Sequence, residues 1–189
     1  MTVHEPMTST RPDAADRMLD FRPGMGMRWE ITHGADDTVG WLFQSTNWLD
    51  PRMPSPPVHV HPTSAESFVV IEGALDVYVD GEWSRVRAGE RVTVPANVPH
   101  TLRNGTDAPV KMRTIVEPAG RAELFFRHMH RLIQEGKIKQ LPPKEPRSAI
   151  YVAMLFGSYS DVIRTTKPPA ALFKVLAGIG RMLRFRLEP

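Results

Sequence analysis

The chain of 189 residues contains no cysteine. This absence excludes a disulfide framework and thiolate ligands, so any bound metal must be held by nitrogen and oxygen. No apolar run reaches the length of about 18 residues that a membrane-spanning helix needs. The polar N-terminal stretch MTVHEPMTSTRPDAAD also lacks the apolar core of a signal peptide. We therefore expect a cytoplasmic protein.

The overall composition is that of an ordinary globular chain, with 41% hydrophobic and 24% charged residues. Its length predicts one domain with extensions. The charge is uneven: residues 1–119 hold 11 Lys and Arg against 16 Asp and Glu, whereas residues 120–189 hold 13 against 5. The basic residues are scattered, without interleaved aromatic residues or a DNA-binding motif. We therefore interpret them as a solvated helical surface and expect no nucleic-acid partner.

Three histidines and one glutamate form the most informative pattern. His59 and His61 flank a β-branched residue, so they should project from the same face of a strand with Cα atoms about 6–7 Å apart. Glu66 follows a turn at Pro-Thr-Ser-Ala, and His100 follows a second turn at Pro-Ala-Asn-Val-Pro. A carboxylate that opens the apolar stretch SFVVIEG needs a partner, and a cation would satisfy it. The pattern predicts a site for one divalent metal ion at His59, His61, Glu66 and His100.

These residues resemble the two motifs of the metal-dependent cupins. The first motif, G-x5-H-x-H-x3,4-E-x6-G, is matched by His59, His61, Glu66 and Gly73. The second, G-x5-P-x-G-x2-H-x3-N, is matched by Gly89, Pro95, His100 and Asn104. Met53 replaces the opening glycine of the first motif, and Asn97 replaces the inner glycine of the second. Asn is tolerant of the positive φ that such a position favours.

The resemblance covers about residues 25–117 and implies a fold and a chemistry. The fold is an all-β, cupin-type antiparallel jelly-roll β-barrel, here with a C-terminal helical extension. Similarity to flavonol-dioxygenase-like cupins implies oxygen-dependent cleavage of an organic substrate. By that resemblance, Glu66 is both a metal ligand and the catalytic base. The cofactor is one transition metal ion, and the sequence leaves Fe, Mn, Ni, Cu and Zn open.

Local patterns divide the chain into three parts. We predict a disordered N-terminal arm over residues 1–22, the β-barrel over residues 23–118 and the helical extension over residues 119–189. The predicted strands are 27–32, 39–46, 58–61, 66–72, 75–79, 82–86, 91–95, 100–104 and 110–116. Asp80-Gly81 is a hairpin signal between two of them. The predicted helices are 120–135, 145–158 and 168–186.

Strand alternation predicts the lining of the pocket. If Glu66 and His100 point inward, their faces are mostly apolar, whereas Lys111 and Arg113 face water. The predicted substrate contacts are Phe68, Val70, Leu102, Met112 and Thr114. Such a lining favours a small, mostly apolar organic substrate.

Three classes of function fit this pattern. The first is a metal-dependent oxidoreductase of the dioxygenase type. The second is a metal-dependent sugar isomerase or epimerase, although a sugar phosphate would need inward Lys or Arg. The third is a non-catalytic small-molecule sensor or binding protein. A regulatory cupin usually carries a helix-turn-helix segment before the barrel, and we expect the N-terminal stretch here to be too short and too polar for one. We favour the first.

Two predicted apolar surfaces need another element or subunit to pack against them. Val69 and Ile71 lie opposite Glu66 in the strand pattern, so either the C-terminal helices or a second subunit should cover them. Because cupins often pair through this sheet, we predict a homodimer. The stretch ALFKVLAGIGRMLRFRL is a basic amphipathic helix. We expect it to pack on its own domain rather than on a membrane surface.

Overall fold

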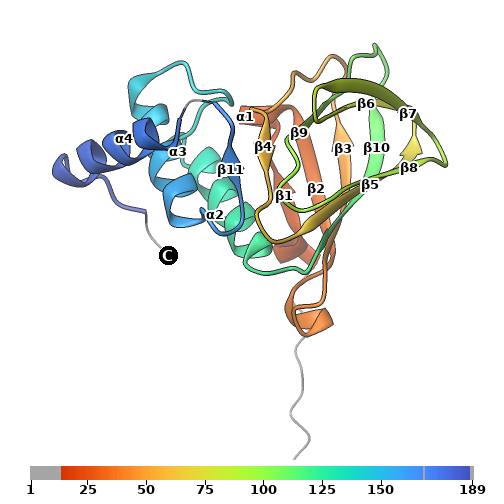
Figure 1. Ribbon diagram of the computed structural model, residues 1–189, viewed down its shortest axis with the longest axis horizontal. Coiled ribbons are helices and arrows are strands. Elements are labelled where there is room, and N and C mark those ends of the chain that lie inside the picture. The colour runs from red at the N-terminus through yellow and green to blue at the C-terminus, as the bar shows by residue number, and fades with distance from the viewer. Residues whose placement is uncertain (1–13, 168, 188–189) are drawn as a thin grey trace, which may run out of the picture.

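Two antiparallel sheets face each other, and three helices lie beside them (Figure 1). The computed structural model describes residues 14–167 and 169–187. The first sheet has the order β1 (Met18–Asp20), β2 (Met27–His33), β3 (Phe43–Leu49), β10 (Val110–Glu117), β5 (Ala65–Glu72) and β8 (Arg91–Val94). The second has the order β11 (Arg164–Thr165), β4 (His59–Val60), β9 (His100–Arg103), β6 (Ala74–Val79) and β7 (Glu82–Arg87). Strands that are far apart in the sequence, such as β3 and β10, are neighbours in these sheets, and this strand order is that of a jelly roll.

The core lies between the two sheets because their strands bury alternate side chains. In β3 every second residue is buried, from Phe43 to Leu49, and β10 pairs with this strand along its length. The mainly β jelly-roll fold with C-terminal helices is thus confirmed. The predicted jelly-roll β-barrel is not closed: within the described residues the pairings form two separate sheets rather than one continuous ladder.

Turn chemistry explains where the strands begin and end. Asp80 and Gly81 have φ angles of 46° and 105° and join β6 to β7 with Val79 opposite Glu82, as the hairpin signal predicted. The strand predicted to begin at residue 39 begins only at Phe43. Val39 and Gly40 have φ angles of 53° and 78° instead, and they form a turn after the short 3₁₀ helix η2 (Asp36–Thr38).

The predicted disordered arm is wrong for residues 14–22, and residues 1–13 lie outside the described chain. A 3₁₀ helix, η1 (Ala14–Arg17), leads into β1, which pairs with β2, and α1 (Arg22–Met25) follows. Leu19 and Phe21 are buried, and the Phe21 ring meets Trp29 edge to face at 5.3 Å between centroids. These two apolar side chains anchor the segment, although charged residues surround them in the sequence.

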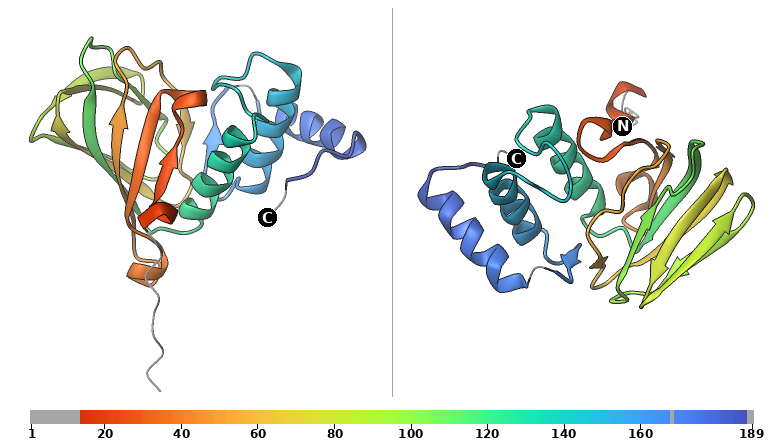
Figure 2. Two further views of the ribbon diagram at one scale, coloured as in Figure 1. Left: turned by 180° about the vertical axis from the view of Figure 1, so that it is seen from behind. Right: turned by 90° about the horizontal axis from the view of Figure 1, so that it is seen from above.

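All three predicted C-terminal helices are present: α2 (Ala122–Gln134), α3 (Pro146–Ser158) and α4 (Ala170–Met182). They stack outward from the sandwich, with α2 nearest to it and α4 farthest away (Figure 2). The extension is not purely helical, because β11 pairs with β4 and sets Arg164 opposite Val60 and Thr165 opposite His59. The C-terminal extension therefore completes the second sheet beside a predicted metal ligand.

The predictions for the two apolar surfaces have different outcomes. Val69 and Ile71 are half-buried on β5, and the helices lie at the β1, β4 and β11 side of the sandwich (Figure 1). The homodimer through this face therefore stays a prediction.

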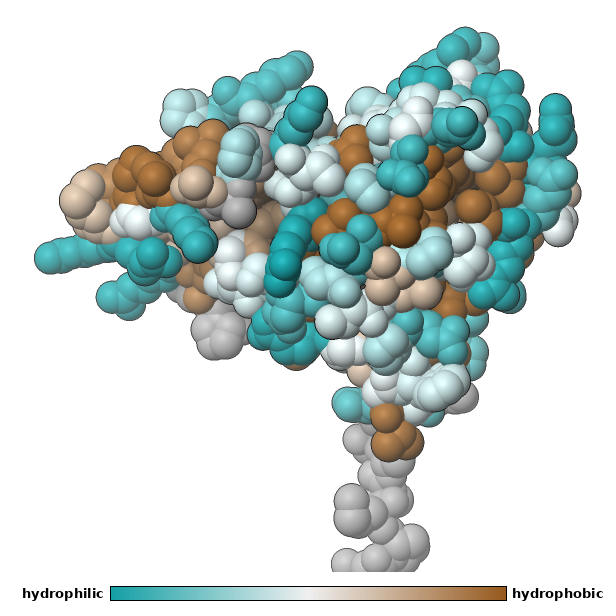
Figure 3. Space-filling view, viewed as in Figure 1, coloured by the Kyte–Doolittle hydropathy of each residue, from teal (hydrophilic) through white to brown (hydrophobic). Residues whose placement is uncertain are grey.

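Helix α4 packs on its own domain on one side only. It buries Ala177 against α3 but leaves Val175 58% and Met182 76% exposed, and apolar surface gathers over α4 in Figure 3. Within the described ranges, no helix has the length and apolar character needed to cross a membrane.

Candidate metal site

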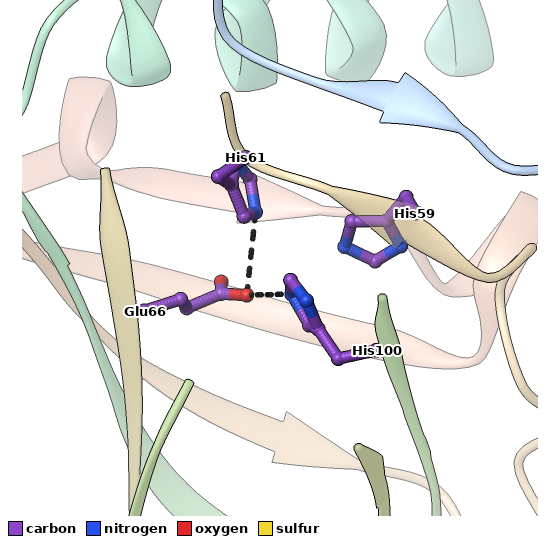
Figure 4. A group of neighbouring side chains, drawn as sticks. All are labelled: His59, His61, Glu66 and His100. Atoms are coloured by element: carbon purple, nitrogen blue, oxygen red, sulfur yellow. Dashed lines mark hydrogen bonds and ion pairs between the residues drawn. The ribbon is translucent and has the colours of Figure 1, made fainter. Parts of the chain in front are cut away.

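The structure brings the four predicted metal ligands together (Figure 4). His59 lies on β4, His61 follows that strand, Glu66 lies on β5 and His100 lies on β9. One ligand atom from each side chain lies within 4.8 Å of the others. His59 and His100 are direct partners in the pairing of β4 with β9, so register places their imidazoles side by side. Glu66 reaches them from the opposite sheet.

Backbone carbonyls orient all three imidazoles. Each Nδ1 lies 2.8 Å from a carbonyl oxygen: Pro57 for His59, Val98 for His100 and Val162 for His61. A carbonyl accepts but cannot donate, so each Nδ1 carries a proton, and each Nε2, once it is deprotonated, can present a lone pair to the centre. This is the arrangement in which metal-binding histidines are usually held.

The inner atoms fit a cation. The Oε2 atom of Glu66 lies 2.9 Å from Nε2 of His100 and 3.3 Å from Nε2 of His61. The geometry around His61 Nε2 leaves this buried atom without a hydrogen bond, which is costly unless another group meets it. Three nitrogen donors and one carboxylate oxygen suit a divalent transition metal ion. A six-coordinate ion at this site would keep two positions for other molecules.

Burial and neighbouring charge separate the pKa values of the ligands. Burial, with repulsion from the two other histidines, lowers the pKa of His59 to about 3. Burial also disfavours the charged form of His61, but the Glu66 carboxylate outweighs it and raises the pKa of that imidazole. Burial works against the charge of Glu66 as well, yet attraction to His61 and hydrogen bonds from the histidines lower the pKa of its carboxyl group. Without metal, a proton therefore belongs on the His61 side of the cluster.

Metal binding should release about one proton at pH 6.5, because the ion and the proton compete for His61. His59 has none to give at that pH, since its pKa is about 3. Affinity should fall about tenfold for each pH unit below the pKa of His61. Calorimetric titration in two buffers with different protonation enthalpies measures the released protons. Release of no proton would contradict this assignment.

The cupin motif positions that are not ligands shape the backbone around the site. Asn97 has a φ of 64°, as its place at the motif glycine predicted, and its backbone N–H donates to the carbonyl of His61 at 2.7 Å. Gly73 has a φ of 84°, and a Cβ there would lie 2.9 Å from the carbonyl oxygen of Pro109. Asn104 donates from Nδ2 to the carbonyls of Asp50 and Ala108. These residues hold the loops between the strands.

A cavity of about 70 Å³ adjoins the four ligands. Four of the five predicted substrate-contact residues line it: Phe68, Leu102, Met112 and Thr114. Val70 does not, which corrects that prediction. Val70 shares a face with Glu66 but lies four residues further along β5, about 13 Å away. As substrate contacts, the four lining residues stay a prediction.

The C-terminal extension supplies much of the remaining wall, which the strand pattern could not reveal. Its lining residues are Phe125, Phe126, Met129, Leu141, Phe156 and Ile163. The carbonyl of Val162, which orients His61, comes from 101 positions further along the chain. The sequence pattern predicted a helix over residues 120–135, but nothing in it indicated that this helix borders the site.

Arg121 anchors the turn that carries Val162. Its Nε donates to Oδ2 of Asp161 at 3.0 Å, its Nη2 donates to the carbonyl of Ser158 at 2.8 Å, and its guanidinium lies 4.7 Å from the Tyr159 ring centre. These contacts hold the turn between α3 and β11 in place. Arg121 therefore acts on the metal site only through the orientation of His61.

Replacing Arg121 with Ala should weaken metal binding about threefold, because the anchor is partly exposed and such contacts are modest. A titration of metal into the purified variant measures the effect. Arg127→Ala is the matched control, since Arg127 lies on α2, of which Arg121 is the N-cap residue, but contacts Glu123 and the backbone of Asp16. Equal losses in both variants would show that the effect is general to the helix.

Comparisons with known proteins agree with the fold and the motifs. Residues 49–116 match the family model described as a cupin domain. The HTH-type transcriptional regulator SutR of Escherichia coli (strain K12) is 43% identical over 27% of this chain and 29% of its own. Quercetin 2,3-dioxygenase of Bacillus subtilis (strain 168) is 36% identical over 25% of this chain and 14% of its own. This chain thus spans less than a third of either relative.

Among solved structures, KdgF from Halomonas sp. aligns with a TM-score of 0.48 and 19% identity, covering 56% of this chain and 89% of that one.

Proposed function

We propose, on the premise that residues 49–116 form a cupin domain, that this protein is a metal-dependent oxidoreductase of the dioxygenase type. The observation that carries the proposal is the cluster of three imidazoles and one carboxylate beside an apolar cavity, in which His59 is half-buried and the other three side chains are buried. Such a set leaves two positions of a six-coordinate ion for substrate and O₂. The partial match to quercetin 2,3-dioxygenase supports the same class.

The ion would supply Lewis acidity and, when redox-active, the electron transfer that O₂ chemistry needs. The chain's own residues would do the rest. Oε2 of Glu66, which the His100 and His61 imidazoles hold in place, would accept a proton from the substrate. Phe68, Leu102, Met112 and Thr114 would contact an apolar substrate, and the aromatic residues of α2 and α3 would exclude water.

The two other functions make different demands on the cavity. A sugar phosphate needs inward cations, and among the described residues no Lys or Arg lines this cavity. A non-catalytic binding role has one specific support, which is the match to a transcriptional regulator over part of its length. It differs from the oxidoreductase in a measurable way, because a binding protein would consume no oxygen.

Oxygen consumption by the metal-loaded protein tests the proposal. The protein is loaded separately with Fe(II), Mn(II), Ni(II) and Cu(II), and each form is presented with phenols, flavonols and diketones. We expect uptake with at least one substrate and its loss in Glu66→Gln, with metal content measured in the same samples. Bound metal without uptake in any combination would contradict the oxidoreductase and favour the binding role.

A further inference from the structure

A groove lies on the outer side of the wall that encloses the metal cavity. It runs between α3, β11 and α4, and it has a volume of about 630 Å³. Twelve residues line it, and three of these are cationic: Arg164, Lys174 and Arg181. None of the twelve is acidic. The groove is therefore a positively charged site in a part of the chain that the cupin motifs do not reach.

The three cations are available to a ligand. Within residues 14–167 and 169–187, none of them takes part in an ion pair. Arg164 donates from Nε to the carbonyl of Ser160 at 2.7 Å, which leaves its terminal nitrogens for another acceptor. Its acidic neighbour Asp161 is paired with Arg121 and attracts Arg164 only from a longer distance, without an ion pair. Lys174 and Arg181 are seven residues apart on α4 and so share one side of that helix.

The floor of the groove is apolar and is shared with the metal cavity. Phe156 and Ile163 line both spaces, and Met154 and Phe173 extend the apolar surface outward. Ile163 and Arg164 are adjacent in the chain. The side chain of Ile163 lines the cavity as well as the groove, and the side chain of Arg164 brings positive charge to the groove. A ligand that fills the groove would press its apolar part against the side chains that close the metal site.

Size indicates that the two spaces work together. Sites for small organic ligands usually measure about 300–1,000 Å³, whereas the cavity at the ligands measures about 70 Å³. A substrate larger than a few atoms must therefore move part of the wall. Phe156, which is 9% exposed, is the wall residue common to the cavity, this groove and a neighbouring groove. The groove of about 630 Å³ supplies the room that the cavity lacks.

We propose that this groove binds the charged end of an amphipathic organic anion, and that the apolar body of the ligand passes Phe156 and Ile163 toward the metal site. Arg164, Lys174 and Arg181 recognise a carboxylate or a phosphate. The inference deepens the proposed function and rests on it for the role of the ligand as substrate. Binding of the anion itself does not depend on the metal.

Fluorescence competition and calorimetry with decanoate, decyl phosphate and decanol at pH 7.5 test the charge requirement. Metal-free wild-type protein should bind at least one of the anions about tenfold more tightly than decanol. Arg164→Gln/Lys174→Gln should lose this advantage, because both side chains are exposed and the fold should not change. Lys167→Gln is the matched control, since Lys167 lines the neighbouring groove instead. A comparison of the affinities for decanoate and decyl phosphate distinguishes a carboxylate site from a phosphate site.

Several results would overturn the inference. Equal binding of the anions and decanol, or an equal loss in Lys167→Gln, would remove the role of the three cations. Binding to phosphatidylglycerol vesicles without binding of either free anion would assign the cations to a membrane surface.

The link to the metal site is tested separately with Mn(II)-loaded protein. The terminal methyl resonance of the bound anion should broaden. Anion binding without broadening would overturn the passage past Phe156, and failure of the protein to bind Mn(II) would count against the proposed function while leaving the anion titration valid.

Discussion

Replacing His100 with Ala should weaken metal binding at least about a hundredfold. Four protein ligands together contribute about 10–16 kcal/mol in well-formed sites, so one ligand accounts for about 3 kcal/mol. His100 is 1% exposed, and its Nε2 lies 2.9 Å from the Glu66 carboxylate. The imidazole therefore cannot be replaced by a nearby side chain or by bulk water without rearrangement of the core. Calorimetric titration with Zn(II) or Mn(II) measures the loss.

The matched control is His33→Ala. His33 ends β2 on the surface and its ring contacts the side chain of Gln44, so its removal should leave metal affinity unchanged. Thermal melting of both metal-free variants shows whether each still folds. Unchanged affinity in His100→Ala, in a folded protein, would mean that the four side chains do not bind the ion together.

Replacing Phe125 with Ala should lower the free energy of unfolding by about 3–5 kcal/mol. Phe125 is 1% exposed on α2, and its ring packs edge to face on Phe126, Phe156 and Tyr159. It joins the first two C-terminal helices to the wall of the metal cavity. A cavity at this point would therefore weaken both the core and the turn that orients His61. Urea denaturation followed by circular dichroism gives the free energy.

Leu124→Ala is the control for the helix itself. Leu124 precedes Phe125 on α2 but is 56% exposed, so its truncation should change stability by no more than about 0.5 kcal/mol. A loss of under 1 kcal/mol for Phe125→Ala would indicate that the helical extension folds independently of the sandwich. A similar loss in both variants would point to a general effect on α2.

The sequence predicts well that the four proposed metal ligands cluster, because their arrangement depends on strand rules and motif spacing. His59 and His61 lie close together because of the two-residue period of a strand. His100 lies on the strand that pairs with the strand of His59, and Glu66 lies on the facing sheet. The positive φ of Asn97 follows from the same motif. For these residues, sequence distance and strand register are enough to predict position.

The remainder of the site depends on long-range packing, which spacing does not encode. The carbonyl of Val162 looks like any other in the sequence, yet it orients His61 across 101 positions. Val70 has the correct strand parity but lies too far along β5, because parity gives the face and not the depth. Phe21 is fully buried although it follows a polar segment. Each of these outcomes is decided by which elements meet in three dimensions.

The central claim is that His59, His61, Glu66 and His100 bind one metal ion. X-ray absorption spectroscopy on metal-loaded protein, with metal content measured on the same sample, tests it most directly. The structure predicts one ion per chain, with three imidazole nitrogens and carboxylate oxygen among its ligands. An ion with fewer imidazole ligands, or no retained ion after loading with Fe, Mn, Ni, Cu or Zn, would contradict the account.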